Sequence, residues 1–212
     1  MNPKISETHR KELLQFLLLK TAAVRSGLKP GELLRVRHCY KARNTEGFQF
    51  CLYRKDILEI MKLDHIELRQ EAGSSLVLFY HRPALARTLE VPENLELLRR
   101  LGYPVEGTCA DCMERLKDRF SDAGIPHEVG VFIGYPAKDV LGFIRNLPRT
   151  PVHRGRWQVF GDAAESISKM RLYRRVELIA GSALDVCGDL QTFFERMTNL
   201  NINIKDRSMA SE

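Results

Sequence analysis

The sequence lacks a long apolar run, and this absence argues against a membrane-spanning helix. The longest apolar stretch, residues 13–24, is interrupted by Gln15 and Lys20 and is shorter than the roughly 20 residues that a bilayer requires. Residues 1–10 mix charges early and carry no basic segment followed by an apolar core, as a signal peptide would. We therefore expect a cytoplasmic protein with no membrane partner.

A disulfide framework is also lacking, because the five cysteines are odd in number and irregularly spaced. Cys109 and Cys112 form a Cys-x-x-Cys pair, and a redox role is favoured by the place of Cys109 at a predicted helix start, where a thiolate is stabilised. The pair also shares an apolar stripe with Met113, Leu116 and Phe120, which favours buried core thiols. No second cysteine pair completes a metal site, so we predict no metal ligands.

No familiar catalytic or nucleotide-binding fingerprint is present. The chain has no Ser-x-x-Lys, Gly-x-Ser-x-Gly, P-loop or dinucleotide-binding pattern. Its net charge of +6 and pI near 9.1 permit an anionic partner without requiring one. These absences leave any cofactor unknown, and they leave a binding domain, an enzyme and a nucleic-acid-binding accessory protein as competing interpretations.

What is present is the composition of a folded protein, with 44% hydrophobic and 28% charged residues. The pattern predicts an α+β (mixed α/β) fold, with one globular domain over residues 1–200 and a mobile tail over 201–212. We expect a mixed sheet of about five strands flanked by helices, with strands at residues 48–53, 65–70, 75–81, 129–133 and 157–160. The strand at 75–81 follows a hairpin signal and is almost continuously apolar, so we expect both of its faces to be covered.

Apolar residues at helical spacing predict the flanking helices. These lie at residues 6–25, 56–62, 83–89, 92–101, 108–123, 136–147, 162–175 and 182–198. Thr108 and Asp111 form a capping-box start, and Gly124 ends the same helix. Residues 33–40 are ambiguous and are interpreted as a short helix. In the helix at 136–147, Phe143 is expected to face inward.

The densest motif is the decapeptide HEVGVFIGYP at residues 127–136, followed by Asp139-Val140 and Gly142-Phe143. We interpret it as a buried strand that ends at Gly134, with Tyr135 at a helix N-cap and Pro136 at the first helical position. Strand ends that lead into helix N-termini are common ligand sites. The candidate ligand-binding residues are therefore Gly134, Tyr135 and Pro136, with Asp139, Arg82 and Trp157 as neighbours. The alternative is that the glycines and the proline serve packing and turning.

His127 and Glu128 begin the same motif and are the candidate catalytic residues of the enzyme interpretation, as a proton-transfer pair. On a strand they would lie roughly 23 Å from Gly134, at about 3.3 Å per residue, and their side chains would face opposite sides of the sheet. We therefore expect one compact site not to use both ends of the motif.

The nucleic-acid interpretation depends on three groups of basic residues, with aromatic residues nearby in the sequence that could stack on bases. None of the groups forms a recognised nucleic-acid motif, and acidic residues are interspersed, so a solvated charged face is the alternative. The groups are Arg35/Arg37/Lys41/Arg43, Arg145/Arg149/Arg154/Arg156 and Arg171/Arg174/Arg175, with Tyr40, Trp157 and Tyr173.

The motif at 127–143 also resembles that of an uncharacterised bacterial family of domains of unknown function, which is met mostly in anaerobes. Segments 27–30, 78–83 and 155–162 resemble further parts of that family, so the resemblance extends over roughly residues 12–198. It implies a shared one-domain fold and brings no activity, cofactor or substrate. Our leading interpretation is a small-ligand-binding or regulatory domain with its site near residues 134–136.

Overall fold

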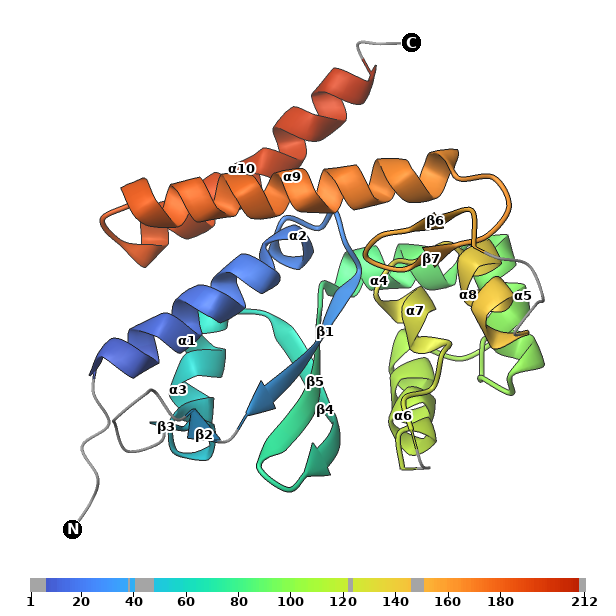
Figure 1. Cartoon of the computed structure of the whole chain (residues 1–212), viewed down its shortest axis with the longest axis horizontal. Helices are drawn as coiled ribbons and strands as arrows, with labels where there is room; N and C mark the ends of the chain where they lie inside the picture. The colour runs from blue at the N-terminus through green and yellow to red at the C-terminus, as the bar shows by residue number, and fades with distance from the viewer. Residues whose placement is uncertain (1–6, 38, 41–47, 122–123, 146–150, 210–212) are drawn as a thin grey trace.

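A three-stranded antiparallel sheet lies at the centre of the computed structural model, which describes residues 7–37, 39–40, 48–121, 124–145 and 151–209 (Figure 1). The strand order is β1-β5-β4, with bounds Gly31–Arg37, Ser74–Tyr80 and Asp64–Glu71. The predicted hairpin is confirmed as β4–β5, which turns through Gly73 at a φ of 81°. β5 is the central strand, as its apolar sequence predicts.

Helices cover both faces of this sheet, and side chains of β5 alternate between the two sides. Val77 and Phe79 enter one hydrophobic cluster, whereas Leu76 and Leu78 enter another. The first cluster is completed by α1 (Glu7–Lys20), α2 (Ala22–Arg25), α3 (Phe50–Met61), α9 (Ala164–Val186) and α10 (Leu190–Met209). The second is completed by α4 (Arg82–Leu89), α5 (Pro92–Arg100), α6 (Cys109–Arg119), α7 (Val129–Phe132) and α8 (Ala137–Ile144).

The α+β class is confirmed, but the sheet is smaller than predicted. Two short antiparallel ladders stand apart from it, β2 (Cys39–Tyr40) with β3 (Phe48–Gln49) and β6 (His153–Arg154) with β7 (Gln158–Val159). The expected strand at 48–53 is mostly helix α3. Conversely, the expected short helix at 33–40 is largely strand β1, because Leu34 and Val36 point into the core while Arg35 between them is exposed.

The expected strand at 129–133 is the short helix α7, and a Schellman motif ends it. Gly134 adopts a φ of 86°, and its N–H donates to the carbonyl of Val131 at 3.0 Å. The N–H of Tyr135 donates to the carbonyl of Gly130 at 2.8 Å, which closes the turn. The apolar run misled the prediction because a short buried helix and a short buried strand carry the same pattern.

The two last helices also differ from the expectation, since α9 runs unbroken through the predicted gap at residues 176–181. Gly181 lies inside it, and an added Cβ would make only an ordinary van der Waals contact there, with Leu19 Cδ1 at 3.9 Å. The predicted helix at 182–198 is wrong as a single element, because α9 ends at Val186 and α10 begins at Leu190. α10 extends to Met209, beyond the predicted end at 198, while residues 210–212 lie outside the described part. None of the described helices combines the length and apolar character that crossing a membrane needs.

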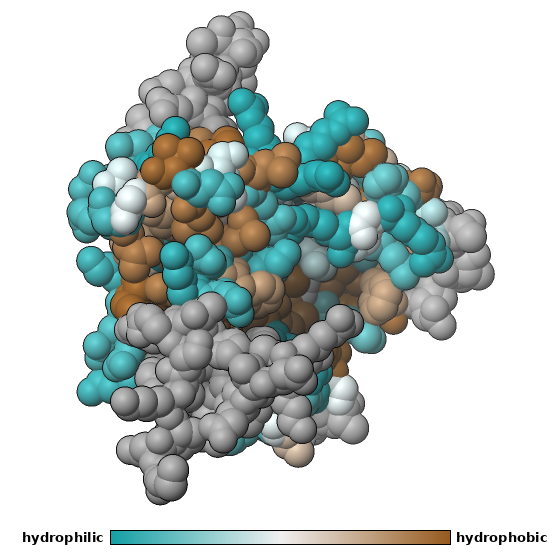
Figure 2. Space-filling view, turned by 60° about the vertical axis from the view of Figure 1, so that its left-hand side comes forward, coloured by the Kyte–Doolittle hydropathy of each residue, from teal (hydrophilic) through white to brown (hydrophobic). Residues whose placement is uncertain are grey.

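Exposed hydrophobic side chains are scattered over the surface. Figure 2 shows them interspersed with hydrophilic residues on the side of the molecule that lies to the left in Figure 1. The large ones in the described part come from several elements, among them Phe16 of α1, Phe143 of α8 and Leu178 of α9. Single exposed apolar groups are ordinary, so only those that line a hollow carry an argument about function.

Candidate functional site

The turn from α7 to α8 is held by close packing at Gly134. A Cβ at this position would lie 2.8 Å from Pro30 Cδ and 2.8 Å from Tyr173 Oη, and the Tyr173 hydroxyl donates to the Gly134 carbonyl at 3.4 Å. Pro136 is buried and forms the N-cap of α8, one residue later than predicted. Gly134 and Pro136 therefore shape the turn from within, and neither lines a pocket wall there.

Asp139 is the centre of a buried hydrogen-bond cluster beside this turn. Its carboxylate is 2% exposed and accepts hydrogen bonds from Trp157 Nε1 at 2.8 Å, Ser166 Oγ at 2.6 Å and the Phe160 N–H at 2.9 Å. Lys138 Nζ lies 2.7 Å from the same carboxylate. Three separate segments, α8, the β7 region and α9, thus meet on one side chain.

The pKa of Asp139 reflects a balance of two causes. Burial raises the pKa of this carboxyl, because a charge is disfavoured away from water. The hydrogen bonds from Lys138, Phe160, Ser166 and Trp157 stabilise the carboxylate more strongly, so that the pKa lies below its ordinary value. Asp139 is therefore ionised at neutral pH, and its hydrogen-bonding capacity is used by the protein itself.

Trp157 is fixed by this cluster and stacks on Tyr135. The two rings are 4.3 Å apart between centroids and 22° from parallel, and Tyr173 lies on Trp157 at 6.5 Å. Burial raises the pKa of Tyr135 to about 12, with a further contribution from Glu32. The Tyr135 hydroxyl is therefore neutral at physiological pH.

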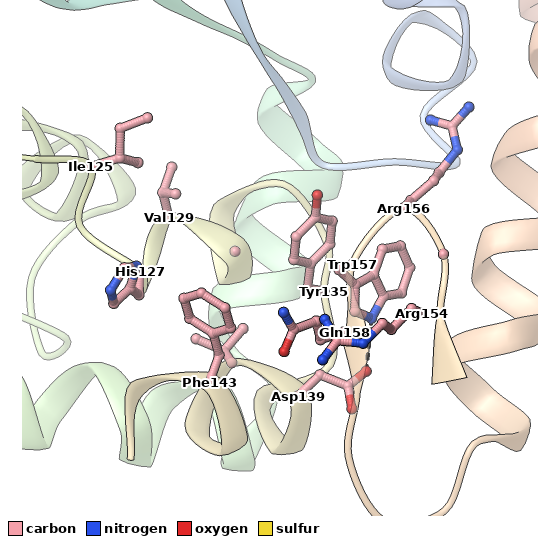
Figure 3. Close-up of a pocket in the computed structure, with 13 residues that line it drawn as sticks. Ile125, His127, Val129, Tyr135, Asp139, Phe143, Arg154, Arg156, Trp157 and Gln158 are labelled. Atoms are coloured by element: carbon pink, nitrogen blue, oxygen red, sulfur yellow. Dashed lines mark hydrogen bonds between the residues drawn. The ribbon is translucent and has the colours of Figure 1, made fainter. Parts of the chain in front are cut away.

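A pocket of about 460 Å³ opens in front of these rings, and we refer to it as the Trp157 pocket (Figure 3). Its apolar wall comes from the segment before α7, from α7 and from α8. That wall consists of Ile125, Val129, Val140 and Phe143. Phe143 is 45% exposed, so the prediction that it faces inward is wrong.

The polar lining of the Trp157 pocket comes mainly from the β6–β7 hairpin. Arg154 and Gln158 are cross-strand partners, and Figure 3 shows their side chains between Phe143 and Trp157. His127 lies at the opposite side, edge-on to Phe143 with ring centroids 4.7 Å apart. Arg156 points away in the same view and pairs with Glu177. The arrangement is an apolar hollow with few polar groups, which is typical of small-molecule sites.

His127 and Glu128 do not form a proton-transfer pair. His127 is exposed, whereas Glu128 is 2% exposed and accepts from Tyr103 Oη at 3.1 Å and Arg119 Nε at 2.9 Å. The two side chains thus point in different directions, as expected, but on the approach to a helix rather than on a strand. The distance to Gly134 calculated for a strand is therefore wrong.

The remaining candidates lie elsewhere. Arg82 is exposed, hydrogen-bonds Asp64 at 2.9 Å and does not line the Trp157 pocket. Burial raises the pKa of Cys109 and of Cys112, the opposite of what a reactive thiolate requires. Within the described part of the chain, no group of three metal-ligating side chains comes together.

The predicted basic groups converge only in part. Arg154 lines the Trp157 pocket, Arg171 and Arg174 line a second hollow on the other side of the hairpin, and Arg156 lines both. Lys41, Arg43 and Arg149 lie outside the described residues.

Sequence reasoning missed Phe143 as an exposed pocket residue, and it missed Ser166 and Gln158 altogether. Nothing in the local pattern marks a serine in the first turn of α9 as a partner of Asp139, because 27 residues separate the two. Gln158 could be inferred only from the hairpin that places it across from Arg154.

The four segments of the family resemblance meet at this site. Pro30 packs against Gly134 and accepts a hydrogen bond from the His81 N–H at 2.9 Å, and Trp157 bonds to Asp139. A family described as "Protein of unknown function (DUF3793)" matches the chain over residues 17–191. No curated protein and no solved structure matches it.

Proposed function

The chain belongs to the DUF3793 family of proteins of unknown function, and we propose that it binds a small molecule in the Trp157 pocket. The observation that carries this proposal is the pocket itself. At about 460 Å³ it falls within the size range of small-molecule sites, and its wall is built on a turn and a carboxylate cluster that hold it in shape. A ligand would therefore meet a largely preformed surface.

The lining favours an amphipathic ligand. An apolar or aromatic group would replace water on Phe143 and Tyr135, and a polar group would face Arg154 and Gln158. Phe143 lines the pocket and is 45% exposed, so its ring is accessible to such a group.

Binding rather than catalysis is the function that the arrangement supports. Asp139 is occupied by its four partners, and Tyr135 is held neutral. Among the described residues of the pocket, no nucleophile lies beside a base. A binding or regulatory domain therefore explains the pocket, and this explanation requires no catalytic group.

The place of action that we infer is the cytoplasm of an anaerobic bacterium. Cys109, Cys112 and Cys187 are free thiols, which persist in a reducing compartment. The bacterial and anaerobic origin rests on the motif at residues 127–143.

Trp157 allows a direct test, because it is the single tryptophan of the chain and lines the pocket. Titration with adenosine and with benzoate should change its emission and raise the melting temperature, since a ligand of the native state stabilises it by mass action. Removing the exposed ring with F143A should weaken the binding roughly tenfold, because burying a phenylalanine side chain contributes about 1.5–3 kcal/mol.

The matched control is F16A, which removes an equally exposed phenylalanine, 40% against 45%, from α1. We expect F16A to bind like the wild type. Equal losses in the two variants, or an emission spectrum that no aromatic compound alters, would contradict the proposal.

A further inference from the structure

The β6–β7 hairpin separates two hollows. One is the Trp157 pocket. The other, about 860 Å³ in volume, lies between the hairpin and α9, and we refer to it as the arginine groove. Gly155 and Arg156, in the turn of the hairpin, line both. A ligand that lies across this turn can therefore reach from one hollow into the other.

The arginine groove carries an excess of cationic groups. Arg156, Arg171 and Arg174 line it together with His153, against two carboxylates, Glu177 and Asp185. Glu177 is already paired with Arg156.

Arg171 and Arg174 are available for an external partner. They are exposed and three residues apart on α9, so their side chains leave the same face of the helix. In the described part of the chain, no carboxylate forms an ion pair with either of them. Since both are exposed, their substitution should leave the core intact.

Arginine pairs of this kind favour phosphate, because each planar guanidinium can donate two parallel hydrogen bonds to its oxygens. We propose that the arginine groove binds the phosphate groups of the ligand whose aromatic part occupies the Trp157 pocket. The ligand class is thus a phosphorylated aromatic small molecule. This inference rests on the proposed function and adds the charge and the second contact surface of the ligand.

Three probes separate the two hollows: adenosine for the Trp157 pocket, inorganic pyrophosphate for the arginine groove, and ADP for both. Adenosine and ADP are followed by Trp157 emission, and pyrophosphate by titration calorimetry on the full chain. We expect ADP to bind at least tenfold more tightly than adenosine, because its phosphates add charge-assisted hydrogen bonds.

The decisive variant is R174A, with R175A as its control. Arg175 is also exposed on α9 but does not line the groove. R174A should weaken pyrophosphate binding about tenfold and remove the advantage of ADP over adenosine, while adenosine binding stays unchanged. R175A should leave all three affinities near those of the wild type.

The outcomes distinguish this inference from the proposed function. If adenosine binds and depends on Phe143 but ADP has no advantage, the groove assignment is overturned and the proposed function stands. If pyrophosphate binds through Arg174 but adenosine, ADP and benzoate all leave Trp157 emission unchanged, the shared ligand is overturned together with the proposed function. Tighter binding of a single-stranded oligonucleotide of about ten nucleotides than of ADP would overturn the small-molecule class in favour of nucleic acid.

Discussion

Asp139 shows how one charged side chain can organise a site through the protein groups that bind to it. A buried carboxylate is costly unless it is paired and hydrogen-bonded, and here donors from α8, the β7 region and α9 meet that need. Because one of the donors is Trp157, the carboxylate also sets the position of the ring that forms the pocket wall.

The first prediction concerns the substitution D139N. The amide keeps the shape of the side chain but loses its charge. It also has one acceptor oxygen fewer for the donors that surround it. We therefore expect the free energy of unfolding to fall by about 3 kcal/mol. Urea unfolding followed by Trp157 emission measures it. D118N, at an exposed aspartate of α6, should change the free energy by less than about 0.5 kcal/mol.

The same variant carries a pH signature. The pKa of Asp139 is lower in the folded chain than in the unfolded chain, where it is about 3.9. The contribution of the carboxylate to stability is therefore complete above the pKa of the unfolded chain and is lost as pH falls through the pKa of the folded chain. The gap between wild type and D139N should therefore be constant near neutrality and close in acid. A gap that widens in acid would contradict this assignment.

At the residue scale the sequence could identify Asp139, Tyr135 and Trp157 as candidates, since all three line the pocket. It could not assign their roles. Whether Asp139 faces a ligand or the protein is decided by Ser166 and Phe160, whose positions depend on the tertiary fold. Arg82 is a candidate neighbour of the site by the same reasoning, but it forms an ion pair with Asp64.

At the scale of elements, the α7–α8 turn depends on the absence of a side chain at Gly134. The second prediction compares G134A with G73A, because both glycines have positive φ, 86° and 81°, but only Gly134 is crowded. G73A should cost about 1–2 kcal/mol from its left-handed backbone. G134A should cost at least about 1 kcal/mol more, because its methyl group meets Pro30 and Tyr173.

Thermal and urea unfolding of the two variants measure the difference. Equal destabilisation would mean that the packing of Pro30 against Gly134 contributes nothing beyond the backbone conformation.

Elements with a local chemical signal were predictable. The capping box of α6 is present, with the Thr108 N–H donating to Asp111 Oδ2 at 2.7 Å and the Asp111 N–H donating to Thr108 Oγ1 at 3.3 Å. The type of the short buried element at α7 was not predictable, because a short apolar run fits a buried helix and a buried strand equally well. Pro136 correctly indicates the start of α8 to within one position, because it is the N-cap and not the first helical residue.

At the scale of the whole molecule, two hydrophobic clusters are separated by a sheet only three strands wide, and Tyr135 packs against both. The third prediction is that they unfold together. L18A and L78A remove fully buried leucines from the first and the second cluster, and each should cost about 2–5 kcal/mol.

In both variants, Trp157 emission and far-ultraviolet circular dichroism should give one shared unfolding midpoint. Two different midpoints would show two independent folding units. In that case L78A would shift the circular dichroism midpoint and leave the Trp157 emission midpoint unchanged. The single domain expected from the sequence rests on this measurement.

The class of the fold follows from the sequence, but the arrangement of its layers does not. The continuous apolar run of β5 predicts a strand covered on both sides. Which helices provide the cover depends on contacts between distant segments, such as α1 and α2 against α9, that no local pattern encodes.

α9 contributes to three parts of the molecule. Arg171 and Arg174 line the arginine groove, and Ser166 donates to Asp139. Val176 and Ala180 pack in the core. Each residue along a helix advances the face by about 100°, so one inserted or deleted residue would rotate every later contact out of register with the earlier ones. Single substitutions at the exposed positions of Ala164–Val186 can be absorbed, but changes of length cannot. In the evolution of this family, insertions and deletions should therefore accumulate in the connecting loops and be purged from this helix.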